Sequence, residues 1–347
     1  MTDIHIRRAG RAGRITLNRP KALNALTWEM CLEIEAALDS WRDDPAIALI
    51  VIDAAGDRAF CAGGDIAVMY ETARAGDYDY GRRFWRDEYR MNAKLAEYPK
   101  PIVSFLQGFT MGGGVGVGCH AAHRVVGDTS RIAMPECGIG LVPDVGGSWL
   151  LARAPGHTGE YLGVTGARMG PGDAIFAGFA DHYLPEAAWP ARIAALEESG
   201  LAAAVTDHAL PAPGAPLAAM QDDIDRAFAA ATLGDLARWL VREEGDVADS
   251  LRAALARNAP LSMACALELI RRQRAAPDIR AALGNEFRFT YRAAEKADFI
   301  EGIRAAIIDK DRSPRWQHAG PEAVTVAEVA AMLMPLGDAA LTWEERT

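Results

Sequence analysis

The stretch Ile102-Val-Ser-Phe-Leu-Gln-Gly-Phe-Thr-Met-Gly-Gly-Gly-Val-Gly-Val-Gly118 contributes most to the prediction of the fold. Its apolar start is typical of a strand buried on both faces, and its glycines are expected to turn the chain into a helix. Such a turn presents free backbone N–H groups, to which the helix dipole attracts negative charge. Glycines taken alone more often mark only a tight turn with close packing, so both interpretations stay open here.

Two familiar phosphate-binding loops do not fit this segment. The dinucleotide fingerprint needs glycine at positions i, i+2 and i+5, and no start between Gly112 and Gly116 satisfies all three. A nucleotide P-loop ends in Gly-Lys-Ser or Gly-Lys-Thr, which the segment lacks. We therefore predict neither kind of nucleotide site.

Strands and helices alternate on both sides of this segment. Apolar runs predict strands at residues 14–18, 47–52 and 102–106, and apolar residues at three- and four-residue spacing predict a helix at 28–41, which Thr27 can cap. Further helices are predicted after Asp65 and at about 78–98. The alternation indicates an α/β layered core.

From about Pro185 the composition shifts toward Ala, Arg, Glu and Leu. Helical periodicity is predicted at residues 189–204, 217–231 and 261–274, with proline-rich breaks between them. We therefore expect an α/β core at residues 1–184 and a mostly helical region at residues 185–347 that packs on that core, because its helices need a surface to cover their apolar stripes.

Charge and cysteine content exclude several classes of protein. The 347 residues include 37 Lys and Arg against 47 Asp and Glu, a formal net charge of −10 that lacks the basic excess of nucleic-acid binders. The five cysteines form no CxxC pair and no His cluster at metal spacing, so we expect a reduced, metal-free protein. The first 14 residues lack a signal-peptide core, and no stretch is apolar enough to span a membrane, so we expect a soluble cytoplasmic protein.

A second glycine-rich bend, Ala59-Phe-Cys-Ala-Gly-Gly-Asp-Ile66, also follows a buried strand. Two such bends can each supply one backbone N–H to the same point in space. That is the requirement of an oxyanion hole, in which two fixed donors stabilise an oxygen that gains charge during acyl chemistry.

A third segment, Met134-Pro-Glu-Cys-Gly-Ile-Gly-Leu-Val-Pro-Asp-Val-Gly-Gly147, places Glu136 and Asp144 in one loop. Two carboxyl groups in a low-dielectric pocket can have pKa values pushed apart, so that one accepts a proton or attacks while the other donates or orients. The alternative is that Glu136 and Asp144 only cap successive helices.

Together these segments resemble the crotonase (enoyl-CoA hydratase/isomerase) superfamily. The resemblance runs from about residue 15 to 181 and includes Leu17-Asn-Arg-Pro-Lys-Ala-Leu-Asn-Ala-Leu26, Phe60-Cys-Ala-Gly-Gly-Asp-Ile66, the glycine triplet and Met134-Pro-Glu136. It implies a ClpP/crotonase-like spiral of ββα units with a C-terminal helical region, acyl-CoA ligands, and an oxyanion hole formed by the amides of Gly64 and Gly113.

A hydratase of this superfamily would use a glutamate three residues after the second glycine of the triplet, where this chain has Gly116. The chain keeps Glu136 and adds Asp144, a combination that resembles the 3-hydroxyisobutyryl-CoA hydrolases of valine breakdown. Also similar are Glu88 in Arg86-Asp-Glu-Tyr-Arg-Met-Asn92 and the segment from Asp298 to Asp311 with Trp316 after it.

This second resemblance implies substrate contacts at Glu88, Gly113, Glu136 and Asp144. Glu136 would be a nucleophile that forms a mixed anhydride, or a general base on water, and the sequence leaves both open. Asp144 would position the water or assist departure of the thiolate, and Glu88 would bind the substrate's 3-hydroxyl. No cofactor is expected, because CoA is part of the substrate.

Two alternative functions remain. One is an enoyl-CoA isomerase or hydratase, since a single glutamate can shuttle a proton while the oxyanion hole holds an enolate. The other is a non-catalytic acyl-CoA or RNA-binding member of the fold. We expect no nucleic-acid or membrane partner, and a homo-oligomer remains open. The preferred acyl group is also open, and Lys21 and Lys310 are candidates for the cations that contact CoA.

Overall fold

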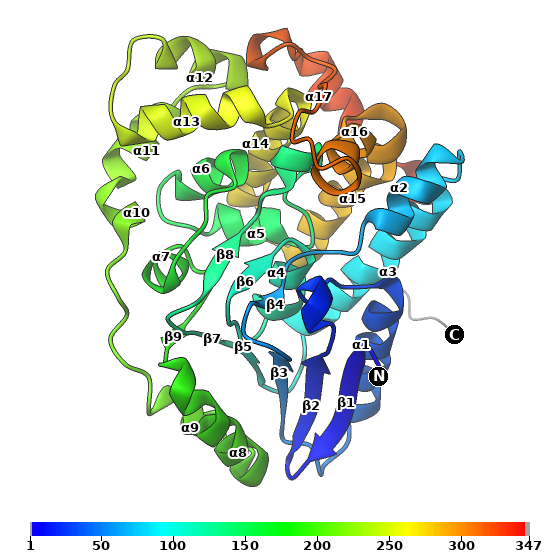
Figure 1. The fold of residues 1–347 in the computed structure, drawn as a ribbon, viewed down its shortest axis with the longest axis vertical. Coiled ribbons are helices and arrows are strands. Elements are labelled where there is room, and N and C mark those ends of the chain that lie inside the picture. The colour runs from blue at the N-terminus through cyan, green and yellow to red at the C-terminus, as the bar shows by residue number, and fades with distance from the viewer. Residues whose placement is uncertain (1, 344–347) are drawn as a thin grey trace. The chain divides into compact units, whose positions relative to one another are not determined.

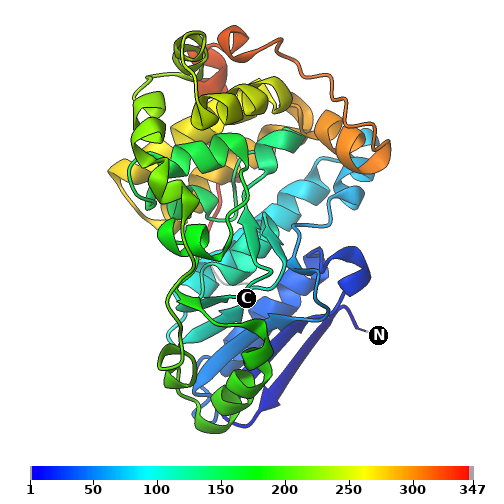
Figure 2. The ribbon, with the colours of Figure 1, turned by 60° about the vertical axis from the view of Figure 1, so that its left-hand side comes forward.

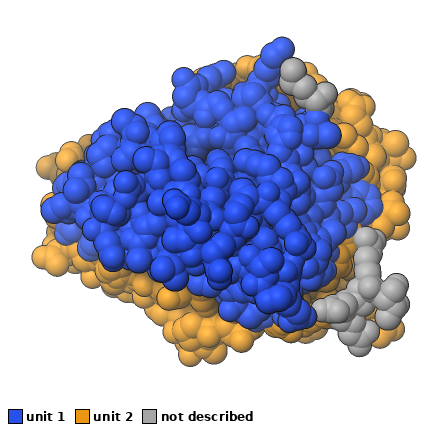
Figure 3. Space-filling model, turned by 90° about the horizontal axis from the view of Figure 1, so that it is seen from below, with its two compact units in different colours: residues 1–65, 91–133, 168–218 blue, residues 66–90, 134–167, 219–347 orange. Residues whose placement is uncertain are grey.

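The computed structural model describes residues 2–343. It divides into two compact units, each built from three stretches of the chain (Figure 3). Unit 1 takes in residues 1–65, 91–133 and 168–218, and unit 2 takes in residues 66–90, 134–167 and 219–347. The boundary that we expected between residues 184 and 185 separates an α/β part of the sequence from a mostly helical part. It is a different kind of division from these two compact units, and it stays a prediction.

Unit 1 contains both sheets of the protein's α/β part (Figure 1). The larger sheet has the order β1-β2-β3-β5-β7-β9, and the smaller has the order β4-β6-β8. The strands are β1 (Ile4–Ala9), β2 (Ala12–Leu17), β3 (Leu49–Ala54), β4 (Ala59–Cys61), β5 (Ile102–Phe105), β6 (Phe109–Met111), β7 (His123–Val126), β8 (Arg131–Ala133) and β9 (His182–Tyr183). Only β1 and β2 pair antiparallel, and the other pairs are parallel.

Successive strands alternate between the two sheets. After β3 in the larger sheet comes β4 in the smaller, and β5/β6 and β7/β8 repeat this step. The chain therefore winds as a spiral of strand pairs, the α/β arrangement that the resemblance implies. Parallel pairing also places the carboxyl ends of β4, β6 and β8 at one edge of the smaller sheet.

Helices of unit 1 cover the larger sheet. The helices and 3-10 turns are η1 (Pro20–Ala22), α1 (Trp28–Trp41), α4 (Gly113–Gly118), α7 (Pro171–Phe176), η3 (Glu186–Ala188), α8 (Trp189–Ser199), α9 (Ala203–Thr206) and α10 (Pro216–Ala219). The segment that carries α8 and α9 lies beside the strands of the larger sheet (Figure 2). Alternate residues of the strands, such as Val51, Val103 and Phe105, form a buried cluster with Trp189 and Val205 of these helices.

Unit 2 is helical. Its elements are α2 (Ala67–Arg74), η2 (Glu136–Ile139), α5 (Gly147–Ala152), α6 (Thr158–Thr165), α11 (Gln221–Phe228), α12 (Leu233–Leu240), α13 (Asp246–Arg257), α14 (Pro260–Ala275), α15 (Ile279–Lys296), α16 (Phe299–Ile303), the π-helical turn η4 (Arg304–Ile308), η5 (Pro321–Ala323), α17 (Val326–Met332) and η6 (Gly337–Ala339). Helix α3 (Asp79–Ala96) continues past the end of this unit's first stretch at Arg90. The buried helix α14 packs against α5, α6 and α15.

Most sequence predictions of single elements are confirmed, including the cap of α1, where the Thr27 side chain accepts a hydrogen bond from the Met30 amide at 3.2 Å. Two are corrected. Residues 59–61 and 109–111, which we interpreted as parts of glycine-rich turns, form the strands β4 and β6. Strands of three residues have too short a pattern to recognise, and their partners in the sheet define them. Within residues 2–343, no helix combines the length and apolar character needed to cross a bilayer.

Candidate active site

The two glycine-rich bends of unit 1 follow the neighbouring strands β4 and β6. The first bend carries Gly64, and the second carries Gly113 at the start of α4. The bends are in close contact, because a Cβ atom added to Gly114 would lie only 2.2 Å from the carbonyl oxygen of Cys61. Glycine is therefore required at position 114 for the two backbones to approach each other.

The amides of Gly64 and Gly113 are available to a ligand. In the isolated bridge between Leu26 and Gly64, the Leu26 amide donates to the Gly63 carbonyl at 2.9 Å and the Asp65 amide donates to the Leu26 carbonyl at 2.8 Å. The bridge thus leaves out the Gly64 N–H, which donates no backbone hydrogen bond among residues 2–343. Gly113 is the first residue of α4, where an amide has no partner within the helix.

Unit 2 brings four buried carboxyl groups together. Glu88, Glu136 and Asp144, which the sequence analysis selected, are at most 4% exposed, and Glu286 is 0% exposed. They come from α3, from η2, from the loop before α5 and from α15. None of the four forms an ion pair with a basic side chain in the described part of the chain.

Burial and mutual repulsion shift the acidities of these groups. Burial raises the pKa of Glu88 and of Glu136 well above the ordinary glutamate value, and the charge of Asp144 raises both further. Burial also raises the pKa of Asp144 to about 7, although a hydrogen bond from Tyr89 opposes the rise. A carboxyl group with a pKa near 7 can both accept and release a proton at neutral pH, as acid–base catalysis requires.

Hydrogen bonding within the cluster is uneven. The Tyr89 hydroxyl donates to Oδ2 of Asp144 at 2.7 Å, and so fixes the orientation of that carboxylate. By contrast, Oε1 of Glu88 and Oε2 of Glu136 are buried without a hydrogen-bond partner among the described residues. Buried polar atoms are nearly always satisfied in proteins, so these two oxygens are open to hydrogen bonds from a bound water or ligand.

Sequence reasoning missed Tyr89 and Glu286. Tyr89 follows Glu88 directly, so the segment that pointed to Glu88 contained the signal for it. Glu286 lies in a regular helical stretch far along the chain, and nothing in its local sequence distinguishes it from a solvated helix residue. In the described residues, no group of three or more His, Cys, Asp or Glu side chains is placed to hold a metal ion.

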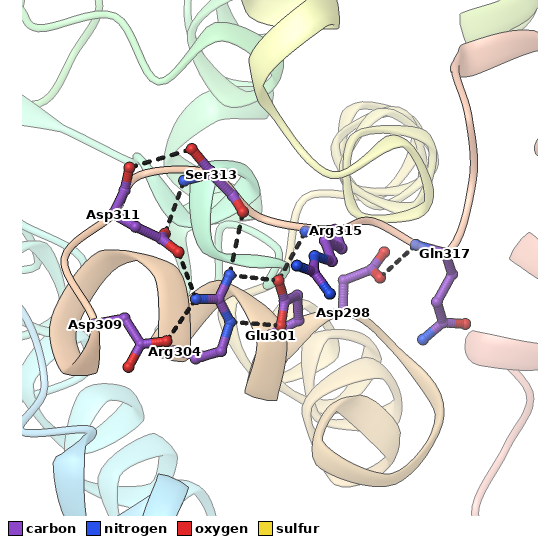
Figure 4. Close-up of polar contacts among 8 residues, drawn as sticks. All are labelled: Asp298, Glu301, Arg304, Asp309, Asp311, Ser313, Arg315 and Gln317. Atoms are coloured by element: carbon purple, nitrogen blue, oxygen red, sulfur yellow. Dashed lines mark hydrogen bonds and ion pairs between the residues drawn. The ribbon is translucent and has the colours of Figure 1, made fainter.

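A second polar cluster fixes the loop after η4 (Figure 4). At its centre, the Arg304 guanidinium contacts three carboxylates and one carbonyl at 2.6 to 3.1 Å, those of Glu301, Asp309, Asp311 and Ser313. Lys310 lies in this loop with a left-handed backbone, φ 57°, and an exposed side chain. Lys21, the other candidate for contacting CoA, is exposed in η1 of unit 1.

Comparison with known proteins gives consistent family matches. The model of the family "Enoyl-CoA hydratase/isomerase" matches residues 12–333. The mitochondrial 3-hydroxyisobutyryl-CoA hydrolase of Gallus gallus is 34% identical, over 97% of this chain and 90% of its own length. The enzyme of the same name from Rattus norvegicus is 36% identical, over 96% of this chain and 89% of its own length.

Two solved structures are similar to the whole chain. A protein from Rhodobacter sphaeroides 2.4.1, described as an enoyl-CoA hydratase, is 60% identical, with a TM-score of 0.93 over 98% of this chain and 100% of its own. A protein from Mycobacterium thermoresistibile, described as a carnitinyl-CoA dehydratase, is 39% identical, with a TM-score of 0.94 over 100% of both chains.

The expected cytoplasmic location is contradicted by these relatives, since the hydrolases of Gallus gallus and Rattus norvegicus are named as mitochondrial proteins. The prediction rested on reduced cysteines and on the lack of a signal-peptide core. All five cysteines are indeed free and buried. However, free cysteines are expected in every reducing compartment, so they do not distinguish the cytoplasm from the mitochondrion.

Proposed function

The chain belongs to the 3-hydroxyisobutyryl-CoA hydrolase family of the enoyl-CoA hydratase/isomerase superfamily, and we propose that it hydrolyses 3-hydroxyisobutyryl-CoA or a related short 3-hydroxyacyl-CoA. Water adds at the thioester carbonyl carbon, the C–S bond breaks, and the free hydroxy acid and CoA are released. We further propose that this reaction serves valine catabolism and needs no bound cofactor.

The observation that carries the proposal is the buried cluster of Glu136, Asp144 and Glu88. A hydratase of this superfamily would use a glutamate at position 116, and this chain has glycine there. The chain has instead a second carboxyl group at Asp144, which the Tyr89 hydroxyl orients and whose pKa burial raises to about 7. Hydrolysis uses two carboxyl groups in different roles. Isomerisation of an enoyl-CoA needs only Glu136 to move a proton, so it would leave Asp144 without a function.

We assign Glu136 to the attack on the thioester. Its Oε2 is buried and unpartnered, so in the ionised form it is available either to attack the carbonyl carbon, giving a mixed anhydride, or to remove a proton from water. Asp144 would then position the water or protonate the departing thiolate. A single turnover in ¹⁸O-labelled water separates the two routes, because only an anhydride allows water to attack the Glu136 carbonyl and so label the enzyme.

The Gly64 and Gly113 amides are proposed as the oxyanion hole. Both lack competing backbone hydrogen bonds among the described residues, and the bends that carry them are in contact within unit 1. Two fixed N–H donors stabilise the negative oxygen of the tetrahedral intermediate, and loss of one such donor typically lowers the rate by about 10² to 10³.

Glu88 is proposed to select for a 3-hydroxyl group. Its Oε1 has no partner and its side chain is 3% exposed, so a substrate hydroxyl would satisfy an otherwise costly buried oxygen. A substrate without the hydroxyl leaves that oxygen unpaired. The site should therefore favour hydroxyacyl over plain acyl substrates more strongly than it separates branched from unbranched chains, since one methyl is worth only about 1 to 3 kcal/mol.

Acyl-CoA is the proposed binding partner, and the net charge of −10 argues against nucleic acid. Lys310 is a proposed contact for the CoA phosphates, because its side chain is exposed on a loop that the Arg304 cluster holds in place. Lys21 is the second such candidate.

Hydration of an enoyl-CoA is the second candidate function, because the 60% identical protein from Rhodobacter sphaeroides is described as a hydratase. Gly116 argues against it, since the chain then lacks one of the two glutamates that a similar hydratase would use. A hydratase would consume the double bond of an enoyl-CoA and release no thiol.

The test is the release of free CoA from 3-hydroxyisobutyryl-CoA, followed with a thiol reagent and compared with 3-hydroxypropionyl-CoA, isobutyryl-CoA and crotonyl-CoA. We expect rapid thiol release from the two hydroxyacyl esters and none from crotonyl-CoA. Glu136→Gln should remove the activity. The proposal is rejected if the wild-type protein releases no thiol from saturating hydroxyacyl-CoA, and hydration of crotonyl-CoA by that protein would support the hydratase instead.

A further inference from the structure

Glu286 holds the loop that carries Asp144. From α15, its Oε2 accepts a hydrogen bond from the Gly146 amide at 2.8 Å, and its Oε1 accepts one from the Ser148 amide at 2.9 Å. The Ser148 hydroxyl donates a third bond to Oε1. The loop is thus fixed two and four residues after Asp144, where α5 begins.

These contacts favour the ionised form of Glu286. Both of its oxygens accept from N–H groups, which cannot accept a proton in return, and the side chain is 0% exposed. Hydrogen bonds from two amides and a hydroxyl to a carboxylate lower its pKa, which offsets part of the opposing effect of burial. Burial still raises the pKa of Glu286 to about 7, so near neutral pH this carboxyl group is partly ionised, in the same pH range as Asp144.

The backbone around Asp144 needs such a support. Val145 and Gly146 both have left-handed backbone angles, φ 53° and 80°, and valine rarely adopts such an angle. A strained conformation persists only where the surrounding structure holds it. Here the two amides that flank Gly147 are bonded to Glu286, and the Gly147 amide donates to the Asp144 carbonyl at 2.6 Å.

We propose that Glu286 is a positioning residue for this site: its carboxylate fixes the Asp144 loop through the Gly146 and Ser148 amides and stands as a further acidic group beside Asp144 and Glu136. The catalytic role of Glu286 rests on the proposed function. Its effect on the ionisation of Asp144 and Glu136 can be tested without a substrate. Repulsion between two carboxylates is mutual, so each disfavours ionisation of the other.

The groups whose pKa values the charge of Asp144 raises are Glu88 and Tyr89 from α3, Glu136 from η2 and Glu286 from α15. Glu286 interacts through its charge with Asp144, Tyr89 and Glu136. All of these groups are acidic or neutral, so no positive charge among them screens Glu286. Removing its charge should therefore make Asp144 and Glu136 easier to ionise.

The test is a pH titration of the Asp144 and Glu136 side chains by carboxyl-carbon NMR, on protein labelled with ¹³C in aspartate and glutamate. Asp144→Asn and Glu136→Gln assign the two signals. In Glu286→Gln the Asp144 midpoint should fall by about 1 pH unit, and the Glu136 midpoint should fall in the same direction. With 3-hydroxyisobutyryl-CoA, kcat should fall about 10- to 100-fold with less than about a twofold change in KM.

Glu160→Gln is the matched control. Glu160 is also a carboxylate of unit 2 with 0% exposure, but it contacts Arg274 and His157 and not the cluster. It should leave the Asp144 midpoint in place even if it destabilises the fold as much. Ser148→Ala is the second test variant if Glu286→Gln does not fold. Without the Ser148 hydroxyl, Glu286 takes up its proton at higher pH and carries less negative charge. The Asp144 midpoint should therefore fall, but by less than 1 pH unit.

The outcomes separate the two proposals. If the wild-type protein releases no thiol, the proposed function fails while the titration still tests Glu286. If Glu286→Gln folds and the Asp144 midpoint stays within 0.2 pH units of wild type, the inference about Glu286 is overturned. The same holds if Ser148→Ala leaves that midpoint unchanged. A lower kcat with unmoved midpoints would assign Glu286 to structure alone and also reject the inference.

Discussion

Gly114→Ala is expected to impair the oxyanion hole without touching a proposed catalytic group. The added Cβ would lie 2.2 Å from the Cys61 carbonyl oxygen, 2.9 Å from its Cβ and 3.0 Å from its carbonyl carbon. Nonbonded carbon atoms pack at about 3.5 to 4.0 Å, so the two bends must separate by about 1 Å. The atoms in conflict belong mainly to backbone, so no side-chain rotation relieves the clash.

The size of the effect follows from this displacement. Overpacking a rigid site typically costs about 1 to 3 kcal/mol of folding free energy. Moving a catalytic donor by about 1 Å costs about 10² in rate, and complete loss of one oxyanion donor costs about 10² to 10³. We therefore expect kcat/KM for 3-hydroxyisobutyryl-CoA to fall about 100-fold, mostly through kcat.

The assay combines thiol release with urea unfolding, so that activity is compared only where the protein is folded. Gly284→Ala is the control: this glycine also lies within a helix, α15, and a Cβ there would meet nothing within 4 Å. It should keep its activity and gain up to about 1 kcal/mol of stability. The reasoning is refuted if folded Gly114→Ala retains more than a third of the wild-type kcat/KM.

Three further outcomes are expected. Tyr89→Phe removes the hydroxyl that stabilises ionised Asp144, so the Asp144 midpoint in carboxyl NMR should rise above about 7, opposite to its shift in Glu286→Gln; a fall would contradict the role of the hydroxyl. Asp144 and Glu286 have pKa values raised to about 7, so their contribution to stability is complete below about pH 4 and is lost as the pH rises through 7. Urea unfolding at pH 5 and pH 8 should therefore show a loss of stability that Asp144→Asn reduces, and an equal loss in that variant would disprove the linkage. Thr27→Ala should lower the free energy of unfolding, measured by urea titration, by about 1 kcal/mol with unchanged kcat, because it removes the cap of α1. An unchanged free energy of unfolding would contradict the stabilising role of this cap.

Prediction from sequence reached the elements and residues that have strong local signals. The buried strand at 102–105 and the capped helix α1 follow from apolar spacing and a threonine at the right position. Glu88, Glu136 and Asp144 stood in segments that resemble a known family, and the structure places all three in one buried cluster. Their roles, and those of the Gly64 and Gly113 amides, remain predictions.

The sequence by itself indicated the strands and helices with a strong apolar pattern and the positions of the glycine bends, because apolar periodicity and backbone freedom are properties of neighbouring residues. Tertiary structure decided which distant groups meet: the short strands β4 and β6 exist only through pairing, and Glu286 reaches the Asp144 loop from a helix more than 130 residues later in the chain. Hydrogen bonds and charge repulsion act over a few ångströms of space whatever the separation in sequence, so local patterns could not reveal that contact.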